Sequence, residues 1–162
     1  MTMEQANALT RVEFVEQLGW VFERSPWVAE RAWASRPFAS LEALHAAMTA
    51  AMEGATHNEQ LALLRAHPEL GSRGPMSEAS TGEQAGAGFS SGKRYRREPI
   101  QEYRARFGFP FIYAVKGSTI GDIMVALTLR IEGAPEEEFQ QALCEVRRIA
   151  WFRLQDTFKE SH

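Results

Sequence analysis

The spacing of the apolar residues constrains this fold most, because through most of the chain they recur at the 3.6-residue period of an α-helix. A half-buried strand would need strict alternation instead. One apolar run, Phe109 to Val115, lacks the helical period, and no second convincing strand is present to pair with it. The sequence therefore predicts an all-α fold, in which this run is a buried extended segment or the start of a helix packed in the core.

Side chains that accept hydrogen bonds from unpaired backbone amides mark the expected helix starts. Two stretches have the spacing of a capping box, and Ser25 is expected to cap a helix whose first residue is Pro26 and which ends before Pro37. The expected starts are Thr10-Arg11-Val12-Glu13, Ser25-Pro26, Ser40, Thr56-His57-Asn58-Glu59, Ser118 or Thr119, and Pro135. Together they predict a single-domain bundle of seven or eight helices covering residues 1–162.

The remaining boundaries follow from breaks in the pattern. Periodicity fades between Gly71 and Gly92, so we expect a long loop there, with a short helix around Glu78 to Gly86. The other expected helices are Pro99–Phe107, ended by Gly108; Ser118 or Thr119 to Glu132, ended by Gly133; and Pro135 to about Phe158, whose Glu136-Glu137-Glu138 cluster suits the positive end of the helix dipole.

Charge and composition argue against several classes of protein. Lys and Arg number 18 against 21 Asp and Glu, so the formal net charge is -3, and general binding to nucleic acid is not expected. No apolar run approaches the roughly 20 residues that cross a bilayer, and no secretory leader is visible. The lone Cys144 is interpreted as a buried thiol in a reducing compartment, which predicts a cytoplasmic protein.

Metal and nucleotide sites have little support in the sequence. The four histidines and Cys144 do not occur at metal-ligand spacing, so no metal site is expected. The one basic cluster, Lys93-Arg94-Tyr95-Arg96-Arg97, has the composition of a phosphate-binding segment. A solvated surface is the simpler interpretation, because acidic residues surround the cluster.

Two segments carry side chains suited to chemistry. Pro68 disfavours helical backbone at His67, which should therefore stand where a helix ends, and histidine titrates nearest to neutral pH. The alternative is a histidine that only interacts with the terminal carbonyls. The stretch from Ser80 to Gly88 gathers a hydroxyl, a carboxylate and an amide before a run of small residues; the alternative there is that Ser80 caps a helix by bonding the amide of Glu83.

These segments, taken in order, resemble one family, the 2-oxo-4-hydroxy-4-carboxy-5-ureidoimidazoline (OHCU) decarboxylases of uric acid breakdown. The resemblance spans nearly the whole chain. The blocks that carry it are Phe22-Glu23-Arg24-Ser25-Pro26-Trp27, Ser35-Arg36-Pro37-Phe38, His67-Pro68-Glu69-Leu70, Ser80-Thr81-Gly82-Glu83-Gln84-Ala85-Gly86-Ala87-Gly88, Tyr103 to Ile112, and Glu145 to Leu154.

The resemblance implies an all-helical homodimer that converts OHCU into (S)-allantoin and carbon dioxide without a cofactor. It implies that His67 is the catalytic histidine, Glu83 its partner carboxylate, and Arg153 an arginine that positions the substrate anion. The positions that align with substrate contacts are Pro68, Ser80 and Gln84, together with the backbone of Phe111, Ile112, Tyr113, Ala114 and Val115.

Alternatives remain open at this stage. Without the resemblance, Arg153 would be interpreted as a cation that complements the helix dipole near the helix C-terminus. A noncatalytic helical module that binds an acidic partner through Lys93 to Arg97 is a second function. A third is the same pocket acting on a different ureido or imidazoline acid.

Overall fold

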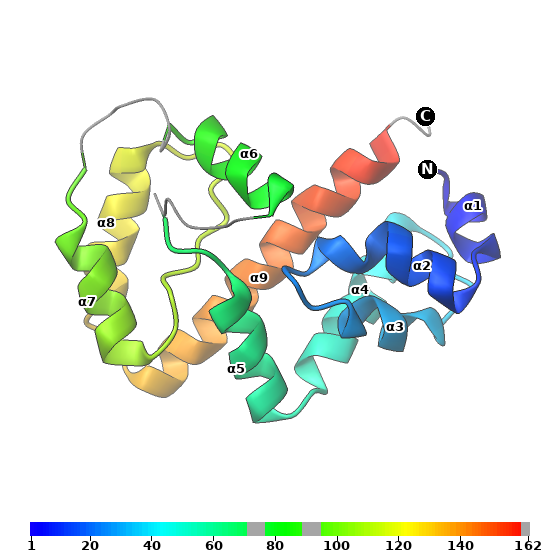
Figure 1. Cartoon of the computed structure of the whole chain (residues 1–162), viewed down its shortest axis with the longest axis horizontal. Helices are drawn as coiled ribbons and strands as arrows, with labels where there is room; N and C mark the ends of the chain where they lie inside the picture. The colour runs from blue at the N-terminus through cyan, green and yellow to red at the C-terminus, as the bar shows by residue number, and fades with distance from the viewer. Residues whose placement is uncertain (71–76, 89–94, 160–162) are drawn as a thin grey trace. The chain divides into compact units, whose positions relative to one another are not determined.

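The computed structural model describes residues 1–70, 77–88 and 95–159. Within these residues the chain forms nine α-helices, a single turn of 3-10 helix and no strand (Figure 1), which confirms the all-α prediction. Eight of the helices have seven or more residues, and α1 is shorter. The elements are α1 Met3–Ala8, α2 Arg11–Leu18, η1 Gly19–Val21, α3 Trp27–Trp33, α4 Leu41–Glu53, α5 His57–Ala66, α6 Glu78–Gly86, α7 Glu98–Phe107, α8 Ile120–Arg130 and α9 Pro135–Phe158.

The chain divides into two units, each with its own core. Unit 1 consists of Met1–Ala66 and the chain from Arg147 onward, and unit 2 is His67–Val146. Helix α9 therefore supplies its first half to unit 2 and its second half to unit 1. None of the helices in the described part of the chain combines the length and apolar character that crossing a bilayer requires.

The capping signals predict the helix starts closely. Thr10 accepts a hydrogen bond from the Glu13 amide at 3.2 Å while the Glu13 side chain accepts from the Thr10 amide at 2.9 Å, and Thr56 with Glu59 and Thr119 with Asp122 form the same reciprocal pair. Ser40 caps α4 as expected. Each of these contacts satisfies amides that a helix start leaves unpaired.

Two expected helix boundaries are corrected by the structure. Ser25 does not cap α3, because its hydroxyl donates to the carbonyl of Glu23 at 2.9 Å, and Pro26 precedes the helix rather than opening it. Helix α8 ends at Arg130 rather than Glu132, since the Gly133 amide already turns back to the Arg130 carbonyl at 3.0 Å. By contrast, Gly108 ends α7 with a φ of 82°, the left-handed backbone that glycine adopts without strain.

In unit 1 the core lies between amphipathic helices. Helix α3 packs against both α2 and α4. The rings of Phe14 and Phe38 stack with centroids 6.0 Å apart. The side-chain amide of Asn7 both donates to and accepts from the backbone of Phe38, at 3.0 and 2.8 Å. Helix packing and contacts between its helices and loops therefore both contribute to the core of this unit.

In unit 2 the core is aromatic and surrounds a segment without regular structure. The fully buried ring of Tyr103 on α7 lies 4.6 Å from that of Phe107 and 5.1 Å from that of Phe111, measured between centroids. Residues 109–115 form neither helix nor strand, and six of the seven are buried. The run is therefore buried as predicted, and of the two predicted alternatives the one in which it starts a helix is wrong.

Candidate active site

His67 follows directly on the last residue of α5, as the proline at position 68 predicts. Its side chain is buried, with 7% of the residue exposed, and Pro68 beside it is half-buried. A buried imidazole at a helix end lies in a fixed position rather than at a solvated surface. This is a setting in which a histidine can exchange a proton with a bound molecule.

Helix α6 carries three of the predicted site residues. Ser77 caps this helix by accepting from the Ser80 amide at 3.1 Å, so the alternative in which Ser80 is the cap is wrong. Ser80 and Gln84 are buried, and Glu83 is half-buried. The side-chain amide of Gln84 donates to the carbonyl of Glu69 at 3.2 Å, which brings α6 together with the segment that contains His67.

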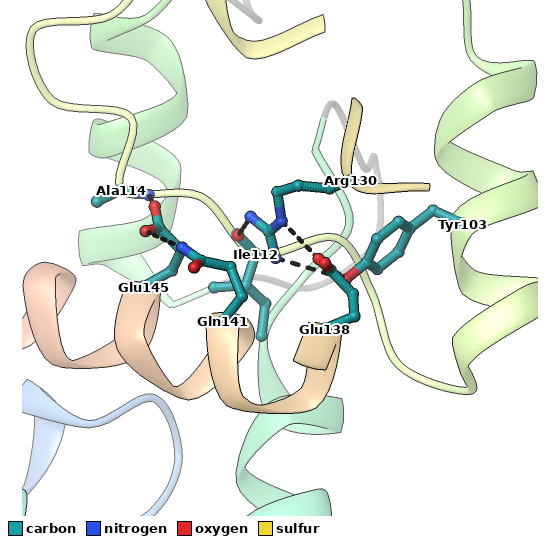
Figure 2. Close-up of polar contacts among 7 residues, drawn as sticks. All are labelled: Tyr103, Ile112, Ala114, Arg130, Glu138, Gln141 and Glu145. Atoms are coloured by element: carbon teal, nitrogen blue, oxygen red, sulfur yellow. Dashed lines mark hydrogen bonds and ion pairs between the residues drawn. The ribbon is translucent and has the colours of Figure 1, made fainter. Parts of the chain in front are cut away.

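The predicted backbone site at residues 111–115 lies in the core of unit 2. Phe111, Ile112, Ala114 and Val115 are buried, and Tyr113 is half-buried. Figure 2 shows that two backbone groups of this run are bound by side chains: the Ala114 amide donates to Glu145 at 3.0 Å, and the Ile112 carbonyl accepts from Arg130 at 2.8 Å. The segment is thus fixed by side chains of α8 and α9.

A buried ionic network supports the same segment. Arg130 pairs with Glu138, and the Tyr103 hydroxyl donates to the same carboxylate at 2.6 Å (Figure 2). Burial raises the pKa of the Tyr103 phenol well above its usual value, and the hydrogen bond to Glu138 raises it further. The phenol therefore remains a donor throughout the neutral range, and Glu138 accepts from two donors at once.

Arg153 belongs to unit 1, where it is a buried anchor. One terminal nitrogen donates to the carbonyls of Trp20 and Val21 at 3.1 and 3.4 Å, and the other to Glu23 at 2.8 Å. Its side chain is 3% exposed and that of Glu23 is 1% exposed. The interpretation of Arg153 as a cation at the helix terminus is therefore wrong, because the guanidinium is engaged by η1 and Glu23 inside the unit.

Sequence reasoning missed the polar residues that hold the irregular backbone, namely Glu23, Tyr103, Arg130, Glu138 and Glu145. It linked Glu138 to the helix dipole, and Glu138 does lie in the first turn of α9, but the residue is also 4% exposed and pairs with Arg130. A signal was available, because Glu138 and Glu145 are seven residues apart and so lie on the same apolar stripe of α9. A carboxylate within such a stripe needs a buried partner.

Other predictions concern residues away from these contacts. In the basic cluster Arg96 and Arg97 are exposed, while Lys93 and Arg94 lie outside the described residues. Cys144 is half-buried rather than buried. Among the described residues no group of three His, Cys, Asp or Glu side chains is placed to hold a metal ion.

Unit 1 also contains a cleft of about 350 Å³ between α4 and α9. The imidazole of His45 lies at its wall, 2.9 Å from the carbonyl of Arg147 and 5.1 Å, between ring centroids, from Trp151. The lining residues are Glu42, His45, Arg147, Arg148, Trp151 and Phe152. None of them is a predicted site residue.

The all-α fold of this chain resembles that of proteins whose structures have been solved. It superposes on the crystal structure of an (S)-allantoin synthase with a TM-score of 0.74 and 30% sequence identity, over 96% of this chain and 54% of that one. The model of the OHCU decarboxylase family matches residues 7–155. The chain therefore belongs to the OHCU decarboxylase family.

Two relatives are similar over nearly their full lengths. The 2-oxo-4-hydroxy-4-carboxy-5-ureidoimidazoline decarboxylase of Haloferax volcanii is 46% identical, over 98% of this chain and 96% of the relative. The protein of the same name from Halalkalicoccus jeotgali is 43% identical, over 96% and 91%. The family predicted from the sequence motifs is confirmed.

Proposed function

We propose that this protein is a carboxy-lyase that decarboxylates OHCU to (S)-allantoin and carbon dioxide in uric acid degradation. Family membership over residues 7–155 supports the reaction class. The observation that carries the assignment of the site is the buried His67 at the end of α5, at the position that the sequence resemblance gives to the catalytic histidine.

The chemistry asks for proton transfer and orientation. The bond between the carboxylate and the ring carbon breaks, and its electron pair moves toward the ring C=N bond, whose nitrogen gains a proton. The hydroxyl on the carbon that lost the carboxylate then gives up its proton as the ureido-bearing carbon is protonated on one face. Because the substrate supplies its own electron sink, we propose that no cofactor takes part.

Each predicted residue has a role in this proposal. His67 moves the protons, since an imidazole titrates near neutral pH. Glu83, half-buried on α6, fixes the tautomer of the imidazole or holds the substrate hydroxyl. Arg153 binds the substrate carboxylate; a guanidinium has five N–H donors, so this role is compatible with its bonds to Glu23 and η1.

Substrate contacts come from two segments of unit 2. On α6 and beside His67, we assign Ser80, Gln84 and Pro68 to the substrate. In the run from Phe111 to Val115, of which all but Tyr113 are buried, we assign the backbone groups to the ring amides, as the sequence resemblance implies.

We also propose that residues 1–162 act as one catalytic domain, which the family match across both units supports. A cytoplasmic location fits the single cysteine. A homodimer rests on the sequence resemblance, and light scattering at micromolar concentration tests it: a mass near 18.2 kDa would contradict it, and twice that mass is expected.

The decisive experiment generates OHCU in situ from urate, adds this protein, and follows the circular dichroism of the allantoin formed. Rapid appearance of the (S)-enantiomer is expected, and a racemic product at the uncatalysed rate would contradict the proposal. His67→Asn should lower turnover about 10²- to 10⁴-fold, the usual contribution of a general acid or base, with the fold retained. His57→Asn, at an exposed histidine that opens α5, is the matched control and should remain active.

A further inference from the structure

Among the residues of unit 2 that the structure describes, 109–115 form a run that is largely buried without belonging to a helix or strand. Buried backbone groups require partners, and in a helix or sheet other backbone groups provide them. Here two of them are bound by side chains: Glu145 accepts from the Ala114 amide, and Arg130 donates to the Ile112 carbonyl (Figure 2). The segment is held by side chains that are distant in sequence.

The two bound groups flank one residue. Ile112 and Ala114 lie on either side of Tyr113, which is the one member of this run that is not fully buried. The protein thus clamps the backbone immediately before and after its most accessible residue. Such a clamp fixes the direction of the intervening peptide groups, which is what a site that reads ring amides with backbone atoms needs.

Burying a charged side chain in a core costs desolvation free energy. Glu145 is 2% exposed, and an apolar residue of similar volume usually stabilises a buried position as well as an ion does. Its second carboxylate oxygen accepts from the Gln141 side chain, one turn earlier on α9, at 3.2 Å, which orients the group toward Ala114. Holding that amide explains a carboxylate at this position better than core stability does.

We propose that Glu145 is a positioning residue of the active site: it fixes the Ala114 amide so that residues 111–115 present their backbone to the substrate ring, while Arg130 fixes Ile112. The inference rests on the proposed function, because it takes this segment as the part that binds the ring. Glu145 acts through Ala114 and takes no part in proton transfer. Its loss should therefore weaken substrate binding and loosen facial selectivity more than it slows the chemical step.

The test compares three variants at one position. Glu145→Gln keeps an oxygen that can accept from Ala114 and should stay within about threefold of the wild-type KM, whereas Glu145→Ala should raise KM about tenfold or more, as one lost charge-assisted hydrogen bond allows. Glu145→Asp keeps the charge but draws it back from Ala114, and should resemble the alanine variant. In the alanine and aspartate variants we also expect a lower enantiomeric excess of (S)-allantoin, with a smaller change in kcat.

The control is Leu44→Ala, which opens a cavity in the core of unit 1 at a fully buried residue. It should lower thermal stability and leave KM unchanged. Wild-type KM in both Glu145→Ala and Glu145→Asp would overturn the inference, as would an equal rise of KM in Leu44→Ala. If the alanine variant does not fold, the contrast between Asp and Gln decides.

Hydrogen exchange separates this inference from the proposed function. Amides of residues 109–115 should exchange faster in Glu145→Asp than in Glu145→Gln, whether or not OHCU is turned over. Equal protection in the two variants would reject the positioning role even in an active enzyme. If the wild-type protein does not turn over OHCU but the exchange difference between the two variants is seen, the proposed substrate is wrong. The role of Glu145 in fixing residues 109–115 is then still supported.

Discussion

One arginine in each unit, buried Arg153 and half-buried Arg130, makes contacts of the same kind in a different setting. Arg153 in unit 1 binds Glu23 and the carbonyls of Trp20 and Val21. Arg130 in unit 2 binds Glu138 and the carbonyl of Ile112. In both cases a guanidinium connects a carboxylate to backbone that leaves α-helical geometry, because its planar array of donors reaches several acceptors at once.

The difference lies in how closed each cluster is. The side chains of Arg153 and Glu23 are 3% and 1% exposed, against 13% and 6% for Arg130 and Glu138, and the cluster of unit 2 includes the Tyr103 hydroxyl as a third member. The first cluster fixes a turn between helices, and the second a segment assigned to substrate binding. The comparison teaches that a buried charge marks irregular backbone, whether that backbone serves architecture or chemistry.

Breaking the unit 1 pair should produce the largest effect on stability. Arg153→Met leaves Glu23 charged and buried, and we expect a loss of about 3–5 kcal/mol in the free energy of unfolding, measured by urea denaturation. Replacing both members, as Glu23→Leu with Arg153→Met, should restore most of that loss. If Arg153 also binds the substrate, the double variant remains inactive; a stable and active double variant would limit Arg153 to its anchoring role.

Removing the Tyr103 hydroxyl from the unit 2 network should lower the free energy of unfolding less than breaking the Arg153–Glu23 pair does. Tyr103→Phe keeps the ring packed against Phe107 and Phe111 but withdraws one donor from Glu138. A hydrogen bond to a charged group contributes about 1.5–3 kcal/mol, so a loss of that size is expected in denaturant titrations. Tyr113→Phe, at a half-buried position, serves as the control and should change stability by less than about 0.5 kcal/mol. Equal losses in both variants would mean that the Tyr103 hydroxyl contributes nothing specific.

The exposed ion pair between Arg31 and Glu59 in unit 1 should have the smallest effect on stability. It therefore shows how much burial adds to the other two clusters. Hydrogen bonding from Arg31, the largest cause, and from the Thr56 amide lowers the pKa of Glu59 from 4.5 to about 2. A carboxyl whose pKa is lower in the folded chain stabilises it above pH 4.5, and this contribution is lost as pH falls toward 2.

Glu59→Gln should therefore flatten the decline in stability over that acidic range, as measured by urea midpoints at several pH values. Arg31→Gln should flatten it only in part, because the contacts with Thr56 remain. An unchanged slope in Glu59→Gln would show that this pair does not influence acid stability.

Much of the fold was predictable from the sequence because its signals are local. The reciprocal bonds of Thr10 with Glu13 and of Thr56 with Glu59 span three residues, so the spacing of the two residues reveals them. The position of His67 follows from Pro68 in the same way. Ser25 shows where such spacing rules fail. Its hydroxyl donates to the nearby carbonyl of Glu23, and the spacing of residues does not indicate that this bond forms in place of a helix cap.

The support of the candidate site was not predictable, because its contacts join residues far apart in the chain. Glu145 meets Ala114 across 31 positions, Tyr103 meets Glu138 across 35, and Arg153 meets Glu23 across 130. Only the packing of the helices creates these pairs. The sequence resemblance supplied roles for His67, Glu83 and Arg153, whereas only the structure shows the side chains that hold irregular backbone in each unit.

The chain carries a single thiol, Cys144, and it immediately precedes Glu145 on α9. Because it is half-buried, its alkylation rate reports how often this turn of the helix opens to solvent. A spectroscopist therefore has a built-in labelling point beside the Ala114 contact, with no background from other cysteines and no need to engineer one.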